Sequence, residues 1–204
     1  MKILSQAESA EWLSSRGFDF SIVDSVSHPG WVDMPKLEYI RVYETPTEAR
    51  NQMVLAHQLT EWITGSDVLL WFSAWPFHKD EEETIFREFR EFWGERRSLE
   101  DAPGYAFTFA NASDAYMCAN LLCFMMAFDW EAFVMRGDQQ SILRMDDGII
   151  WTVTRDPEKD GQTDQIFDAL GVFERDLDSL PDIPAFGRFW SRSPRPENRA
   201  EHAE

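Results

Sequence analysis

The stretch from Ala115 to Phe128 most constrains how this chain folds, because Asn120 is its one clearly polar residue. A helix that is apolar on all sides is stable in water only when other elements cover most of its surface. The stretch is also shorter than the roughly 20 residues that a membrane-spanning helix needs. We therefore expect the central buried helix of a water-soluble domain, in which Asn120 makes a structural hydrogen bond.

Length and composition favour one ordered domain. The chain has 204 residues, of which 44% are hydrophobic, with nine Trp and sixteen Phe. A domain of this size buries roughly 70% of its unfolded surface, which is enough for a proper core. We predict a single globular domain over residues 1–182 and a partly flexible, Pro- and Arg-containing tail over residues 183–204.

Patterns along the chain alternate between helix and strand. Ser5 and Glu8 form a capping box, Thr45 and Glu48 form a second one before a helix that runs to about residue 64, and Asn111 or Ser113 caps the central helix. Further helical patterns begin at residue 81 and within 156–182. Strand patterns occupy 18–22, 37–43, 67–75, 105–110, 130–136, 140–145 and 149–154, whereas 27–30 reads as a break.

This order predicts an α+β (mixed α/β) fold. We expect a central mixed β-sheet of about six strands, in which a β-α-β-α-β-α-β run supplies crossover connections. The last three strands are joined by tight-turn sequences, so they should form an antiparallel meander. Helices should pack on the sheet.

Charge limits the classes of partner. The formal net charge is −18, from 37 acidic and 19 basic residues. Binding to a phosphate backbone needs clustered Lys and Arg, so we expect no direct nucleic-acid binding, and an anionic membrane is disfavoured for the same reason. A basic protein, in contrast, would be attracted.

The cysteines and the first residues predict a cytoplasmic location. Cys118 and Cys123 lie five residues apart in the apolar stretch, so their side chains point in different directions on a helix. They read as small buried hydrophobes in a reducing compartment. The sequence from Met1 onward lacks the continuous apolar region of a signal peptide.

One short segment suggests chemistry. Trp75, His78 and Asp80 follow the apolar strand at 67–75, and ligands collect at strand ends in open α/β sheets. His78 would act as a general base oriented by Asp80. The plainer interpretation is a solvated loop in which Asp80 caps the next helix. The chain contains none of the common catalytic or phosphate-binding signatures, so the prediction leans away from an enzyme.

Carboxylates near two turns were also weighed as metal ligands. Asp129 and Glu131 follow the apolar stretch, and Asp146 and Asp147 lie at a turn. The spacing of a calcium loop is missing and the hairpin already explains the second pair, so we predict no metal and no cofactor.

The acidic surplus gives the leading functional hypothesis. Residues 156–182 concentrate it, and we predict that Asp164, Asp168, Asp176 and Asp178, with Trp75, bind a basic partner. In size, acidity and tryptophan content the chain is similar to bacterial immunity proteins, although no stretch matches a motif of a named family. The alternatives are a surface that merely aids solubility, an enzyme with a site near His78 and Asp80, and a structural or oligomeric module.

Overall fold

The computed structural model describes residues 1–23, 26–30, 39–65, 67–74, 80–146 and 148–175. This part of the chain forms five helices and nine strands. The helices are α1 (Gln6–Ser14), α2 (Ala49–Ile63), α3 (Asp80–Phe92), α4 (Ala112–Phe128) and α5 (Pro157–Asp168). The strands are β1 (Lys2–Leu4), β2 (Asp19–Val23), β3 (Val26–Gly30), β4 (Tyr39–Glu44), β5 (Val68–Ala74), β6 (Gly104–Phe107), β7 (Glu131–Arg136), β8 (Ser141–Asp146) and β9 (Ile149–Thr154).

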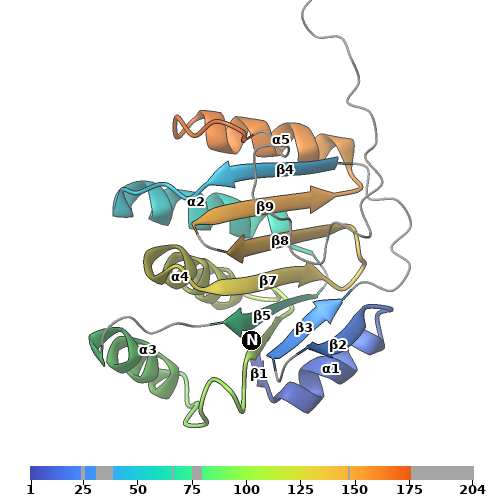
Figure 1. Ribbon diagram of the computed structural model, residues 1–204, viewed down its shortest axis with the longest axis vertical. Helices are drawn as coiled ribbons and strands as arrows, with labels where there is room; N and C mark the ends of the chain where they lie inside the picture. The colour runs from blue at the N-terminus through green and yellow to red at the C-terminus, as the bar shows by residue number, and fades with distance from the viewer. Residues whose placement is uncertain (24–25, 31–38, 66, 75–79, 147, 176–204) are drawn as a thin grey trace, which may run out of the picture.

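Seven of these strands form one open sheet in the order β1-β6-β5-β7-β8-β9-β4, and β2 pairs with β3 in a separate hairpin (Figure 1). The expected α+β class is confirmed, and so is the antiparallel meander of β7, β8 and β9. The sheet has seven strands where about six were expected, and the expected mixed character is wrong, because every described pair of neighbours is antiparallel.

The path of the chain explains why parallel neighbours do not occur among the described strands. The connection from β6 through α4 to β7 is a crossover between parallel strands, but β5 lies between them and is antiparallel to both. The connection through α2 likewise joins β4 to β5 across three other strands. Residue patterns predicted most of the elements and their order, whereas the insertion of a strand between two others depends on contacts distant in sequence.

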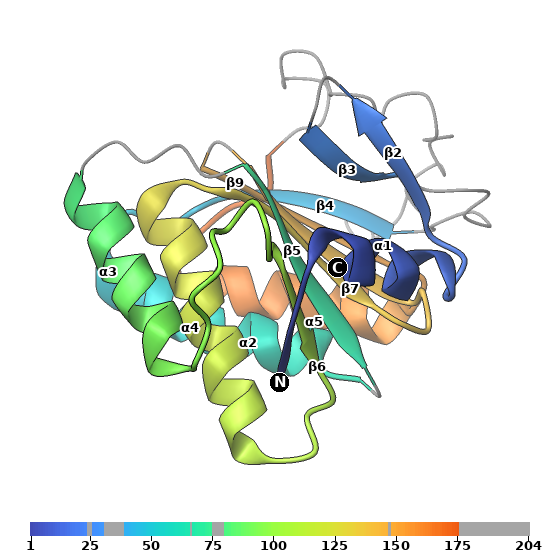
Figure 2. The same ribbon diagram turned by 90° about the horizontal axis from the view of Figure 1, so that it is seen from below.

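The sheet is buried on both faces (Figure 2). One face packs against α2, α3, α4 and α5 in a core that includes Leu70 and Phe72 of β5 and Val134 of β7. The other face packs against α1 and carries Leu69 and Trp71 of the same strand β5. This alternation explains the unbroken apolar run in β5, which is typical of a strand covered on both sides.

Helix starts were predicted correctly in two cases and wrongly in one. Ser5 and Glu8 form the expected capping box, and Asn111 accepts a hydrogen bond from the backbone of Asp114 at the start of α4. The helix predicted after Thr45 instead begins at Ala49, without a side-chain cap. The Thr45 backbone N–H donates to the Gly148 carbonyl at 2.7 Å, which ties this residue to the turn between β8 and β9.

Helix α4 lies in the helical layer and is not covered on every side. Met117, Cys118, Leu121 and Met125 face the core, whereas Tyr116, Asn120 and Ala127 form an exposed stripe. The expectation that Asn120 makes a buried hydrogen bond is therefore wrong, because water reaches this side chain.

The sequence patterns did not predict two of the strands. β1 is only three residues long, and β3 contains the Pro29-Gly30 pair that indicated a break. Proline is tolerated in a hairpin strand at a position that donates no ladder hydrogen bond. Among the described residues, no helix is both long enough and apolar enough to cross a membrane.

Candidate docking surface

The residues predicted to carry function are only partly within the described chain. Trp75, His78, Asp176 and Asp178 lie outside the described residues, so their predicted roles stay predictions. Asp80 is the first residue of α3, but its side chain is not among those described. Asp164 and Asp168, the remaining two, both lie on α5.

Asp164 belongs to an ion-pair network that connects α5 to the sheet. Arg41 on β4 donates to both carboxylate oxygens of Asp160 at 2.7 Å, to Asp164 at 2.8 Å and to Glu174 at 3.1 Å. The Tyr43 hydroxyl donates to Asp164 at 2.8 Å. Burial and this carboxylate raise the pKa of Tyr43, so the phenol stays protonated. Asp164 thus already has two internal partners.

The same network holds the segment after α5 against the edge of the sheet. Glu174 forms a β-bridge with Tyr43, and the Arg175 backbone N–H donates to the Val42 carbonyl at 2.8 Å. Residues that cover an edge strand protect it from pairing with other chains. Asp168, in contrast, is exposed, and Phe173, in the segment after α5, is 79% exposed. Asp168 is thus the described member of the predicted acidic set that is free to meet a partner.

Two of the four candidate metal ligands, Glu131 and Asp146, pair with an arginine, and Asp147 lies outside the described residues. Arg144 is buried and donates to Glu131 at 2.9 Å and to Asp146 at 2.6 Å. Asp129 is an exposed residue in the left-handed conformation that ends α4. The described part of the chain contains no group of three or more side chains arranged to hold a metal ion.

Basic side chains are largely used inside the protein. Within the described chain, those in ion pairs are Lys2, Arg16, Arg41, Arg97, Arg136, Arg144 and Arg175. Arg90 is also buried, and it donates to the carbonyls of Ser98 and Ala102. Each of these ion pairs also uses a carboxylate, and Arg50, Arg87 and Arg96 remain exposed in the described chain.

Helix α3 combines exposed carboxylates with exposed apolar side chains. Ile85 is 50% exposed, Phe92 81% and Trp93 43%. Glu83, Glu88 and Glu91 are exposed on the same helix. Arg87 is exposed on this helix as well, one turn from Glu83 and from Glu91, and Glu83 lies on the opposite side of the helix from Ile85 and Phe92. We define the α3 face by Ile85, Glu88, Glu91, Phe92 and Trp93.

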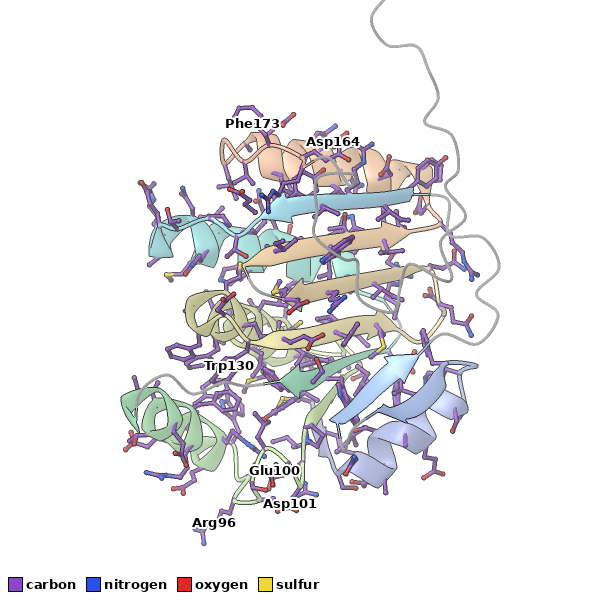
Figure 3. All side chains as sticks on the ribbon, in the orientation of Figure 1. Arg96, Glu100, Asp101, Trp130, Asp164 and Phe173 are labelled. Carbon is purple, nitrogen blue, oxygen red and sulfur yellow. The ribbon has the colours of Figure 1, made fainter. Side chains whose placement is uncertain are left out.

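Aromatic packing fixes α3 on the protein. Phe86 is buried and makes edge contacts with Phe72 of β5 and Phe124 of α4, at ring distances of 5.6 and 5.5 Å. Its ring also lies 4.7 Å from that of Trp130, which Figure 3 places between α3 and the sheet. A rigid support of this kind lowers the entropy cost of presenting a binding surface.

The chain after α3 carries charges of both signs, with Glu95, Glu100 and Asp101 against Arg96 and Arg97. Gly94 adopts a positive φ of 83° just past the helix, as helix-ending glycines do. Beyond it, Glu100 and Asp101 lie at the end of the molecule opposite to Asp164 (Figure 3). Acidic side chains therefore lie at two separate ends of the described chain, and Figure 3 places Arg96 at the same end as Glu100 and Asp101.

A signal for the α3 face was present in the sequence. The apolar residues of α3 cover a wider arc than one core-facing stripe, since Ile85 and Phe92 lie more than 90° around the helix from Phe86. Helical periodicity alone groups all of them into one apolar face. The excess width indicates a helix with more apolar surface than its core contact needs.

Comparison with known proteins does not identify a relative. No protein-family model, curated protein or solved structure matches this chain. Its function therefore has to be inferred from the chemistry of its own side chains.

Proposed function

We propose that this protein is a binding module that docks a basic protein partner on the α3 face. The observation that carries the proposal is the exposure of Phe92, Trp93 and Ile85 among glutamates on a firmly held helix. Protein interfaces are enriched in aromatic residues at their centre and polar at their rim. The α3 face has this composition.

The apolar side chains would supply most of the affinity. Burying an exposed Phe or Ile side chain stabilises a complex by about 1.5–3 kcal/mol. Phe92 and Trp93 lie against each other with ring centroids 5.3 Å apart, so one hydrophobic patch on the partner would cover both. These two residues are the expected hot spot of the interface.

The carboxylates would determine the specificity for the partner. Glu88 and Glu91 sit beside the apolar residues on a protein with a net charge of −18. Complementary charge accelerates association and disfavours like-charged partners, and salt screens the effect. A partner with Lys or Arg around an apolar patch fits, as in the neutralisation of a basic enzyme by an immunity-type or regulatory protein.

Capture from the lysate of the source cell with matched baits tests this proposal. The baits are the unmodified chain, Phe92→Ala/Trp93→Ala and Glu88→Gln/Glu91→Gln. The controls are Met53→Ala, which removes an exposed apolar side chain from α2, and Glu61→Gln/Glu158→Gln, which removes two charges elsewhere. Each complex is washed at about 0.05 M and then about 0.5 M salt.

The pattern across baits decides the result. We expect a basic protein that the unmodified chain and both controls retain, that high salt releases, and that both α3 variants lose. Equal retention by all baits would place binding elsewhere. A further bait, Asp168→Asn, separates the α3 face from the acidic segment 156–182: selective loss with this bait would favour the acidic segment predicted from the sequence.

A further inference from the structure

The chain itself contains a segment with the chemistry that the α3 face would recognise. Residues 183–199 read Ile-Pro-Ala-Phe-Gly-Arg-Phe-Trp-Ser-Arg-Ser-Pro-Arg-Pro-Glu-Asn-Arg. Four arginines stand against one glutamate, and two phenylalanines and one tryptophan lie among them. This stretch is basic and aromatic in a protein whose net charge is −18.

We propose that segment 183–199 of the same chain occupies the α3 face and competes with the partner. The inference rests on the proposed function, because it assigns a regulator to the same surface. Arginine and aromatic side chains would meet Glu88, Glu91 and the pair Phe92 and Trp93, so charge and apolar surface both match. The segment would act as a built-in inhibitor.

The length of the chain permits this contact. Arg175 is held at β4, one edge of the sheet, and α3 lies toward the other edge (Figure 1). Five strand spacings from β4 to β6 amount to about 24 Å. The eleven residues from Arg175 to Phe186 reach about 36 Å when extended, which leaves slack for the path around the molecule.

Competition by the segment should weaken partner binding by a predictable factor. A site that its own segment fills for a fraction of about 0.8 of the time binds a partner about fivefold more weakly than a free site. Changing Arg188, Arg192, Arg195 and Arg199 together to Gln should therefore strengthen partner capture by about this factor.

Paramagnetic relaxation in the full-length chain tests the contact without any partner. A nitroxide is attached to Arg192→Cys in a Cys123→Ser background, in which the buried Cys118 stays unlabelled. We expect amide signals of residues 83–93 to lose intensity relative to the sample with reduced nitroxide. Raising salt from about 0.05 to about 1 M, or adding Glu88→Gln/Glu91→Gln, should restore these signals.

Two results would overturn the inference. One is unchanged intensity over residues 83–93, including the case in which the loss falls on α5 instead. The other is a loss that appears when isotope-labelled chains are mixed with spin-labelled, unlabelled chains, because the occupant would then belong to a second copy. Since the measurement uses the chain alone, its failure leaves partner capture as an independent test of the proposed function.

Discussion

Replacing Arg41 by Met should destabilise the protein more than substitutions at partly exposed sites usually do. Arg41 is 25% exposed and holds Asp160, whose side chain is 11% exposed, through two hydrogen bonds of 2.7 Å. The substitution leaves that carboxylate without its cation, while Asp164 and Glu174 retain more contact with water. It also loosens the attachment of residues 172–175 to β4.

The expected magnitude lies between two limits. Breaking a fully buried ion pair costs about 3–5 kcal/mol, and an exposed pair contributes about 0–1 kcal/mol. Because Asp160 is close to the buried limit and its neighbours are not, we expect a loss of about 2–3 kcal/mol in the free energy of unfolding. For a chain of this length, that corresponds to a fall in Tm of about 4–12 °C.

Urea unfolding followed by circular dichroism measures this loss. Arg50→Met is the matched control, because Arg50 is an exposed arginine on α2, and its effect should stay within about 0.5 kcal/mol. The double variant Arg41→Met/Asp160→Asn should recover part of the loss, since it removes the stranded charge. If Arg41→Met and Arg50→Met had equal effects, the network would contribute nothing to stability and the reasoning would be refuted.

Two further predictions concern titration. The hydrogen bond from Lys2, followed by those from Ser5, lowers the pKa of Glu8 to about 2; NMR titration should give this value, and Ser5→Ala should raise it. Because the folded pKa lies below the unfolded value of about 4.3, the stabilisation is present above that pH and is lost as pH falls toward 2. Burial raises the pKa of Cys118 to about 12, so a thiol reagent at pH 8 should modify Cys123 and leave Cys118 unreacted until urea unfolds the protein. The Cys118 thiol stays protonated in the folded protein above the unfolded pKa of about 8.5, so the free energy of unfolding falls as pH rises from there toward 12. Cys118→Ala should reduce this pH dependence of the free energy of unfolding. An unchanged pH profile in this variant would contradict the prediction.

Local chemistry made much of the fold predictable. The capping box at Ser5 and Glu8, the cap at Asn111 and the turns of the meander depend on residues close in sequence, and each appears as expected. The burial of β5 on both faces followed from its unbroken apolar run. Most patterns with short-range causes therefore predicted the structure correctly, with the capping box at Thr45 and the break at Pro29 and Gly30 as exceptions.

The sequence patterns did not predict contacts between residues that are distant in the chain. Thr45 has the sequence pattern of a helix cap, but α2 begins at Ala49, and Thr45 is hydrogen-bonded to Gly148, about a hundred residues away. Asp164 looks like a free surface charge until Arg41 is placed beside it. Periodicity identifies Phe92 as one of the apolar residues of α3, but it leaves open how much of the helix the neighbouring elements cover, and Phe92 is 81% exposed.

The association rate of the captured partner tests the central claim most directly. Stopped-flow or surface-based kinetics would compare the unmodified chain with Glu88→Gln/Glu91→Gln and Glu61→Gln/Glu158→Gln at about 0.05 and 0.5 M salt. If the α3 face docks a basic protein, the first variant associates about threefold to tenfold more slowly at low salt, the control stays near the unmodified chain, and high salt removes the difference. Equal association rates for the two variants at both salt concentrations would contradict docking on the α3 face.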